Sequence, residues 1–214
     1  MRHEYEANGI DEADFGADPL VHFEAWLADA VAADVPEPNA LVVATVDADG
    51  QPWSRYVLLK EAGPQGFDFY TNYESNKSVQ MTVNPRASLT FGWLPLRRQV
   101  MVAGLVERVP PEVSDAYWAV RPRGSQLGGW ASQQSRPLRD RAELETRYQE
   151  AEAAHGDEVA RPAHWGGWRL RPHTIEFWQG RLNRLHDRLR YTRSLDADGN
   201  GGGEGRWSIT RLAP

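Results

Sequence analysis

Short segments rich in β-branched residues, separated by tight turns, follow one another from Ala40 to Val109. ALVVATVD (40–47) and SRYVLLK (54–60) flank the turn DADG, which is the pattern of a β-hairpin. FDFYT (67–71), ASLTFGW (87–93) and RQVMVAGLVERV (98–109) continue the pattern. Five strands joined by tight turns predict an antiparallel barrel or sandwich, because a parallel sheet needs long crossover connections.

Helical patterns precede and interrupt these strands. Asp18-Pro19 supplies an N-cap and a proline at the first helical position, and apolar residues then recur at helical spacing. A short helix is expected from Ser75 until just before Asn84-Pro85, where the proline disfavours its continuation. Two further helices are expected over 112–120 and 138–155.

The stretch between the last two helices, Arg121 to Ser135, is rich in Gly and Ser, which predicts no regular element. A long irregular stretch inside a compact domain is more often functional than idle. The remaining strands are expected at 165–172, 174–179, 184–193 and 206–214.

The composition bounds the class of protein. A chain of 214 residues can bury a real core, and we expect a single domain over 18–214. Residues 1–17 are polar and acidic with little periodicity, which predicts a flexible N-terminal arm. The formal charge of -6 argues against a nucleic-acid partner, since phosphate backbones require a basic surface. No apolar run approaches the ~18 residues of a membrane span and no signal core is visible, so a soluble cytoplasmic protein without a membrane partner is expected.

Metal chemistry has little support in the sequence. The chain has no cysteine, and its six histidines show no HExxH or similar ligand spacing. Asp196 to Gly205 opens like a calcium loop, but its twelfth position is Trp207 rather than glutamate, and no helices flank it. A flexible hairpin loop explains those glycines better. GxSxG, Walker and GxGxxG motifs are absent too, so hydrolases, kinases and Rossmann dehydrogenases lose their usual support.

WQGRLNRLHDR (178–188) puts Arg184, His186 and Arg188 at alternate positions. On a strand all three would project from one face, because successive side chains point to opposite sides. A solvated sheet face can hold such a row. Arginine forks also suit phosphate and carboxylate, and a histidine between them titrates near neutrality. The row is therefore either a solvated face or an anion site with proton handling.

Further cationic residues precede this row. Arg55 and Lys60 bracket RYVLLK, and Lys77 stands at the start of the expected short helix, where backbone N–H groups and the helix dipole favour an anion. Each alone is best explained as a surface residue. Together they predict two anion sites, because one phosphate cannot use them all. The irregular stretch adds Arg121, Arg123, Ser125, Gln133, Gln134 and Ser135.

Eight segments in order resemble the pyridoxine/pyridoxamine 5'-phosphate oxidase family. They are RYVLLK, GFDFYTN, NPRASLTFGW, RRQVMVAGLVE, RPRGSQLGGWASQQS, WGGWRLRP, IEFWQGRLNRLHDR and the final RLAP. The resemblance implies a mainly β (α+β) fold, an antiparallel split β-barrel with flanking helices, assembled as a homodimer with FMN at the interface.

The resemblance also implies which residues contact FMN. Arg55 and Lys77 would hold its phosphate, helped by Gln134 and Ser135, and the backbone of Val57 and Leu58 would lie along the cofactor. The full set is Arg55, Val57, Leu58, Lys60, Tyr70, Thr71, Asn76, Lys77, Gln99, Gln134, Ser135, Trp178 and Arg188.

The implied reaction is the oxidation by O2 of pyridoxamine 5'-phosphate or pyridoxine 5'-phosphate to pyridoxal 5'-phosphate. Peroxide is released, with ammonia from the amine. Arg184 and His186 would orient the pyridine ring and are the candidate catalytic residues, and Arg188 would stabilise the reduced flavin. The substrate-binding set is Lys60, Tyr117, Arg121, Ser125, Arg184 and His186.

Two departures from the family pattern stand out. Members often carry a basic residue beside the lysine that corresponds to Lys77, where this chain has Asn76. The FMN phosphate would then lose one charge-assisted contact of roughly 1.5 to 3 kcal/mol. Some members also have an arginine-rich segment before the DPL turn, whereas this chain reads IDEADFGADPL. An acidic lid would repel a phosphate, so that role is not carried over.

Two other functions stay open at this point. One is a related split-barrel flavoprotein acting on another substrate, against which RLHDR and RPRGSQ argue. The other is a non-catalytic carrier of flavin or pyridoxal phosphate, which would not need both phosphate sites together with Arg184 and His186.

Overall fold

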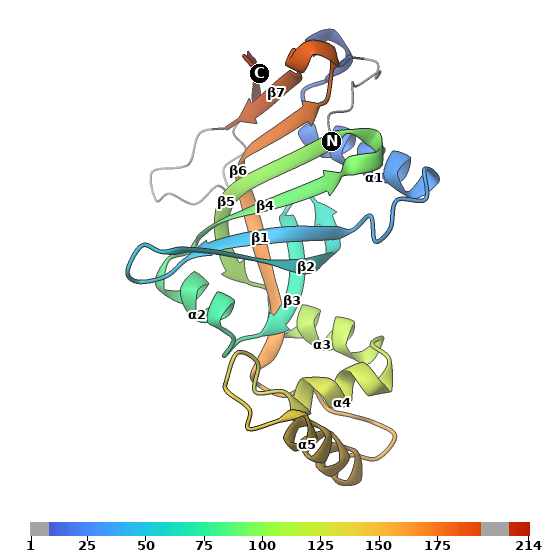
Figure 1. Cartoon of the computed structure of the whole chain (residues 1–214), viewed down its shortest axis with the longest axis vertical. Coiled ribbons are helices and arrows are strands. Elements are labelled where there is room, and N and C mark those ends of the chain that lie inside the picture. Colours follow the sequence, from blue (N-terminus) through green and yellow to red (C-terminus); the bar gives the residue numbers. More distant parts are fainter. Residues whose placement is uncertain (1–8, 194–205) are drawn as a thin grey trace.

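The computed structural model describes residues 9–193 and 206–214. Its eight strands form one antiparallel sheet in the order β3-β2-β1-β4-β5-β6-β7-β8, and an additional β3–β6 pairing closes the first six into a barrel (Figure 1). The predicted antiparallel split barrel with flanking helices is therefore confirmed. The strands are β1 (Ala40–Val46), β2 (Pro52–Gly63), β3 (Gly66–Asn72), β4 (Arg86–Trp93), β5 (Arg98–Arg108), β6 (Trp165–Gln179), β7 (Asp187–Thr192) and β8 (Ser208–Leu212).

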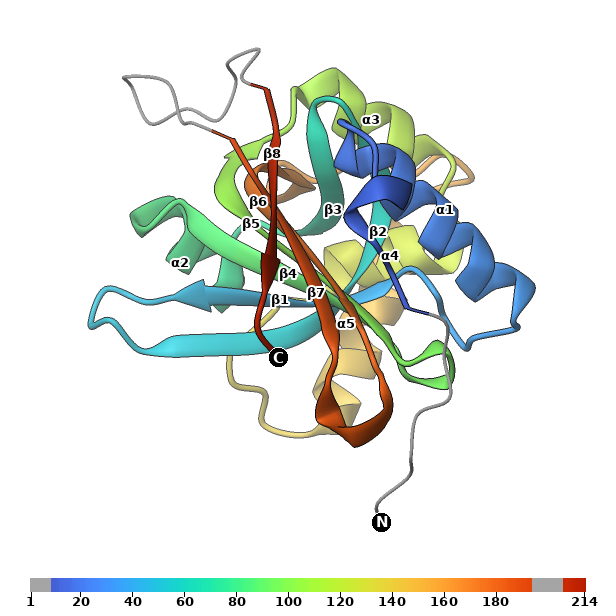
Figure 2. The same cartoon turned by 90° about the horizontal axis from the view of Figure 1, so that it is seen from above.

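Five α-helices and three short 3-10 turns surround the barrel in the described ranges. The predicted start of α1 is confirmed, because the Asp18 side chain accepts a hydrogen bond from the Leu20 N–H at 2.9 Å. Figure 2 shows α1 and α2 on opposite sides of the barrel. The helices are α1 (Pro19–Ala32), α2 (Asn76–Val83), α3 (Pro111–Ala119), α4 (Arg123–Ala131) and α5 (Arg141–Ala154), and the turns are η1 (Glu12–Asp14), η2 (Leu94–Leu96) and η3 (Leu182–Arg184).

The core lies inside the barrel, and α1 contributes to it. Phe23 of α1 is fully buried, and its ring centroid lies 5.0 Å from that of Phe67 and 4.9 Å from that of Phe91. Burying apolar rings of this size is the main favourable term in holding helix to sheet. A second, smaller apolar cluster consists of Trp118 of α3, Leu127 of α4, Val159 and Trp165 of β6.

The expectation that 121–135 lacks a regular element is wrong, because Arg123–Ala131 forms α4. Its Leu127 is fully buried, which offsets the entropic cost of the glycines. A Cβ at Gly129 would lie 2.8 Å from the Trp118 ring, so glycine lets that ring approach the helix. Composition alone could not reveal this contact.

The strands expected at 165–172 and 174–179 are one strand, β6. Its register against β5 shifts between Ala103 and Gly104, which leaves His173 as an extra residue in β6. Such a bulge accommodates Pro172, which cannot donate a ladder hydrogen bond. β6 is consequently long enough to run from α3 and α4 to β7 (Figure 1).

Residues 9–17, expected to belong to a flexible arm, pack on the barrel. Phe15 is 8% exposed and stacks on His22 with ring centroids 4.3 Å apart. The Tyr191 hydroxyl donates to the Gly16 carbonyl at 2.7 Å. Phe15 is a single large apolar residue in an acidic segment, which is too weak a signal to predict this packing. Residues 1–8 of the arm and the calcium-like segment 196–205 lie outside the described residues.

Replacing the ring at the centre of the core tests this account of the fold. Phe23→Ala should lower the free energy of unfolding by about 3–5 kcal/mol, because the side chain is fully buried. Val21→Ala, on the same helix but 59% exposed, should change it by less than about 0.5 kcal/mol. Urea unfolding measures both, and equal losses would contradict the assignment of Phe23 to the core.

Candidate functional site

A cavity of about 490 Å³ lies between the barrel and the helices α3 and α4. Among the described residues, it is lined by three cations, Lys60, Lys77 and Arg121, and by no carboxylate. In a chain with a formal charge of -6, this lining is a local concentration of positive charge. The predicted site residues that it brings together are Val57, Leu58, Lys60, Tyr70, Thr71, Lys77, Tyr117, Arg121, Ser125 and Gln134.

Lys77 is buried at the start of α2. Its ammonium donates to the hydroxyls of Thr71 and Ser75 at 2.9 and 3.2 Å and to Oε1 of Gln134 at 3.1 Å. All three acceptors are neutral. Burial, assisted by the positive charge of Arg55, lowers the pKa of Lys77 from 10.5 to about 8. A buried cation without an anionic partner is destabilised until an anion arrives.

Arg55 and the first turn of α2 extend this positive region. The Arg55 guanidinium donates to the Thr45 hydroxyl and, at 3.1 Å, to Oε1 of Gln80, again neutral acceptors. Ser75 holds the N-cap position, but its hydroxyl donates to the Asn72 carbonyl at 2.7 Å and does not cap the helix. The helix N-terminus therefore keeps its own preference for an anion.

Asn76 and Ser135 meet at the same place. The backbone N–H of Asn76 donates to the Ser135 hydroxyl at 3.2 Å. Ser135 has a φ of 70°, which turns the chain back toward α2 after α4. Lys77, Arg55 and this pair form the first cationic group of the site.

Lys60, Tyr117 and Arg121 form a second cationic group in the same cavity. The Lys60 ammonium lies 5.7 Å from the centroid of the Tyr117 ring. The Arg121 guanidinium lies 4.5 Å from the Trp165 ring and donates to the Ser125 carbonyl at 3.1 Å. Among the described residues, Arg121 Nε is the one buried side-chain nitrogen or oxygen without a hydrogen-bond partner. An unsatisfied buried donor of this kind indicates a position for a bound acceptor.

Gln99, Trp178 and Arg188 lie side by side at the far end of β6. Gln99 of β5 and Arg188 of β7 each pair directly with Trp178, so the three side chains share one face. Arg188 is held there by Glu176, whose carboxylate accepts from its Nε at 2.8 Å.

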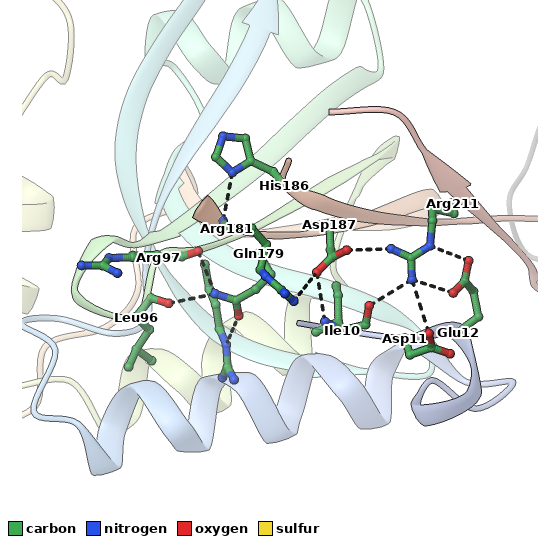
Figure 3. Close-up of polar contacts among 11 residues, drawn as sticks. Ile10, Asp11, Glu12, Leu96, Arg97, Gln179, Arg181, His186, Asp187 and Arg211 are labelled. Carbon is green, nitrogen blue, oxygen red and sulfur yellow. Dashed lines mark hydrogen bonds and ion pairs between the residues drawn. The ribbon is translucent and has the colours of Figure 1, made fainter. Parts of the chain in front are cut away.

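Arg184, His186 and Arg188 do not project from one strand, so that expectation is wrong. Residues 182–184 form the turn η3, and β7 begins only at Asp187. The His186 ring lies 4.7 Å from the Trp178 ring, and its Nδ1 accepts from the Arg181 N–H at 3.0 Å (Figure 3). That hydrogen bond leaves the proton of the neutral ring on Nε2.

Within the described chain, the predicted site residues fall into two separate groups. Tyr70 pairs with Gly167 near the start of β6, whereas Arg188 pairs with Trp178 near its end. These positions are separated by roughly 35 Å of strand at the usual rise per residue. Figure 1 accordingly shows α3 and α4 at one end of the molecule and β7 at the other.

Sequence reasoning missed several residues that support the site. Glu176 is 4% exposed and binds both Arg188 and Arg190. A single carboxylate in the otherwise apolar run IEFW was a usable signal, since buried charges are normally paired. Trp165 beneath Arg121 gave no such signal. Arg123, expected as a site donor, instead bonds to Glu152 and to the carbonyls of 155 and 156, which joins α4 to the end of α5.

Two family models match the chain. The model described as pyridoxamine 5'-phosphate oxidase covers residues 27–155. The model described as the C-terminal dimerisation region of pyridoxine 5'-phosphate oxidase covers 165–214. The chain belongs to the pyridoxamine 5'-phosphate oxidase family.

Similar proteins agree with this assignment. A pyridoxine/pyridoxamine 5'-phosphate oxidase of Cupriavidus pinatubonensis is 51% identical over 100% of this chain and 97% of its own length. One of Bordetella petrii is 53% identical over 100% and 98%. The crystal structure of PhzG from Burkholderia lata, in complex with tetrahydrophenazine-1-carboxylic acid, is 33% identical, covers 94% of this chain and 95% of its own, and has a TM-score of 0.86.

Within residues 9–193 and 206–214, no group of three or more His, Asp or Glu side chains is placed to hold a metal ion. No helix in those same ranges is long and apolar enough to cross a membrane.

The buried charge of Lys77 has a measurable consequence. Its pKa in the folded protein, about 8, lies below the ordinary value of 10.5, so between these pH values the unfolded chain binds more protons. The free energy of unfolding of the ligand-free protein should therefore rise with pH across this window. Lys77→Met should lose this rise, whereas Lys60→Met, at an exposed position, should keep it. Urea unfolding at several pH values is the measurement, and parallel curves for wild type and Lys77→Met would contradict the buried cation.

Proposed function

We propose that the protein is an FMN-dependent oxidase that uses O2 to convert pyridoxamine 5'-phosphate and pyridoxine 5'-phosphate to pyridoxal 5'-phosphate, releasing peroxide. The observation that carries this proposal is the cavity with two cationic groups and no carboxylate. Two groups match two phosphates, one on the cofactor and one on the substrate. The names of the relatives at about half identity support the same reaction.

The residues around Lys77 fit the phosphate of FMN. Lys77 and Arg55 have only neutral partners in the described chain, and Ser75, the N-cap residue of α2, does not cap the helix with its side chain. Gln134 hydrogen-bonds to Lys77 and Ser135 to Asn76, so both side chains lie where they would contact the same phosphate. The cofactor, when bound, supplies the hydride acceptor and the route of electrons to O2.

The second group fits the phosphate of the substrate. Arg121 offers an unsatisfied buried Nε, and Lys60, Tyr117 and Ser125 line the same cavity. These donors would anchor the phosphate and leave the pyridine ring to be oriented by other residues. Anchoring a remote group is how an enzyme converts binding energy into correct placement of the reacting carbon.

Arg184 and His186 would orient the pyridine ring. The hydrogen bond from the Arg181 N–H to His186 Nδ1 fixes the orientation of the imidazole and puts the proton of the neutral ring on Nε2. Arg188 would place positive charge beside the flavin, and Glu176 holds its guanidinium in position.

The two groups of residues would meet across the interface of a homodimer. They lie at opposite ends of β6, so a complete site needs Lys77, Lys60 and Arg121 of one protomer and Arg184, His186 and Arg188 of the other. The match of 165–214 to a dimerisation region supports this arrangement. So does an apolar groove on β1, β2 and β4, along which Tyr56 is 78% and Leu94 83% exposed.

A related flavoprotein with another substrate is the second candidate. Its support is the similarity to PhzG, whose crystal structure contains a carboxylic acid. The second cationic group separates the two proposals, because a phosphate makes fuller use of Lys60 and Arg121 than a carboxylate does. A carrier without catalysis would have no use for Arg184 and His186.

The oxidase proposal predicts a reversible change of colour. FMN-loaded protein mixed anaerobically with pyridoxamine 5'-phosphate or pyridoxine 5'-phosphate should lose its visible flavin absorbance, and air should restore it with pyridoxal 5'-phosphate formed. Unphosphorylated pyridoxamine should react far more slowly, since it leaves Lys60 and Arg121 unused. Bound flavin that neither phosphate bleaches would leave the fold intact and reject the substrate.

Mixing two inactive variants tests whether each site uses two protomers. Lys77→Ala should mainly weaken FMN binding, and Arg184→Ala should keep FMN but lose most turnover. Dimers that contain one copy of each variant would have one site with both defects and one intact site. Random pairing should therefore restore activity at roughly a quarter of all sites.

Co-expression of the two variants with different affinity tags supplies the mixed dimers. The matched control is each variant co-expressed with itself, which should stay inactive. If mixed dimers gain no activity, Lys77 and Arg184 serve the same protomer's site and the shared-site proposal is wrong.

A further inference from the structure

The turn between β6 and β7 has an unfavourable backbone. Asn183 and Arg184 have φ values of 55° and 62°, in the left-handed region that residues other than glycine rarely adopt. Two such residues in succession persist only where surrounding contacts hold them. Arg184 is one of the two candidate catalytic residues and His186 follows it closely. The contacts that hold this turn therefore decide where both side chains lie.

Asp187, the first residue of β7, bonds across this turn to Arg181 and also contacts the N-terminal segment and β8. Its Oδ2 accepts from the Ile10 N–H at 3.3 Å and from the Arg181 guanidinium at 3.1 Å, and its Oδ1 accepts from the Arg211 guanidinium at 2.7 Å. Its side chain is only 17% exposed, so these charge-assisted contacts are partly shielded from water. One carboxylate thus joins the turn to the N-terminal segment and to β8 (Figure 3).

Arg211 fixes the N-terminal segment from the other side. Its guanidinium forms a two-pronged contact with Glu12 at 2.8 and 2.6 Å and also donates to the Ile10 carbonyl at 3.0 Å. Glu12 belongs to the acidic segment before the DPL turn, and its carboxylate is bound to an arginine. This contact lowers the pKa of Glu12 through the hydrogen bond from Arg211. The segment around Ile10 is held against Asp187 as a result.

Arg181 hydrogen-bonds to both Asp187 and His186. Its side chain donates to Asp187, while its backbone N–H donates to Nδ1 of His186 at 3.0 Å. The same residue is thus held by the carboxylate and holds the imidazole. Gly9 lies directly against it, since a Cβ at that position would fall 1.7 Å from the Arg181 guanidinium. The N-terminal segment therefore packs against Arg181.

We propose that Asp187 is a positioning residue that acts through Arg181 and the segment 9–12 to fix Arg184 and His186. It touches neither reacting atoms nor cofactor in this assignment, which rests on the proposed oxidase function. Its carboxylate holds the strained turn in one conformation and sets the tautomer and direction of the His186 ring. No other described side chain contacts Arg181, Arg211 and the Ile10 N–H together.

Asp187→Asn tests the proposal, because it keeps the size of the side chain and removes its charge. In FMN-loaded protein, kcat/KM for pyridoxamine 5'-phosphate per bound flavin should fall about 10- to 100-fold, with a lower kcat and a higher KM. The affinity for FMN should stay within about twofold, since the side-chain partners of Asp187 are Ile10, Arg181 and Arg211 and not the residues proposed to hold the FMN phosphate. Asp187→Glu should recover part of the loss.

Asp29→Asn is the matched control. Asp29 also pairs with an arginine, Arg98, at 2.6 Å, but its side chain is 58% exposed. It should leave kcat/KM unchanged. If the Asp187 cluster only stabilised the fold, Asp187→Asn would lower the urea midpoint and leave kcat/KM per bound flavin at the wild-type value, and that result would overturn the proposal.

A second readout needs neither substrate nor flavin. In 15N-histidine NMR spectra, wild-type His186 should show the Nε2–H tautomer, and Asp187→Asn should shift it toward a mixture. An unchanged His186 signal overturns the positioning role even if the wild type oxidises no B6 phosphate, which would separately reject the proposed function. If Asp187→Asn does not fold, Arg181→Met cuts the same link at a side chain 38% exposed, and an unchanged kcat/KM or tautomer there also overturns the proposal.

Discussion

The pairing of β6 with both β3 and β5 is the constraint on which the rest of the structure depends. It closes the barrel, and it sets where each functional side chain lies. β3 brings Tyr70 and Thr71 to the cavity and leads directly into α2, while β5 and β7 align Gln99 and Arg188 with Trp178. A slip of one residue in this pairing would turn those side chains to the opposite face of the sheet.

Charge is handled differently in the cavity and elsewhere. Buried carboxylates are neutralised within the chain: Asp68 pairs with Arg169, and Glu176 pairs with two arginines. Lys77, by contrast, has only hydroxyl and amide partners, and Arg121 keeps an unsatisfied Nε. The protein thus accepts a cost in stability at the positions where an anion would bind, which is the usual relation between a prepared site and the fold that carries it.

Local signals predicted local features. Alternation and tight turns predicted the hairpins, Asp18-Pro19 predicted the start of α1, and Lys77 was expected at the anion-binding end of α2. The features that could not be predicted depend on contacts distant in sequence. Gly129 permits α4 because Trp118 packs on it, Phe15 holds residues 9–17 to the barrel, and a bulge at His173 makes β6 continuous. The division of site residues between the two ends of β6 likewise follows from topology, which no spacing in one segment encodes.

The position of β6 in the chain also affects how the protein is made. During synthesis from the N-terminus, β1 to β5 leave the ribosome before β6 does, and α3, α4 and α5 come between them. Until β6 emerges, β3 and β5 would each have a row of unpaired backbone groups, and the aromatic core would not be covered by β6. A sheet formed by β1 to β5 alone would therefore be open, with two unpaired edges at which a strand of another chain could pair.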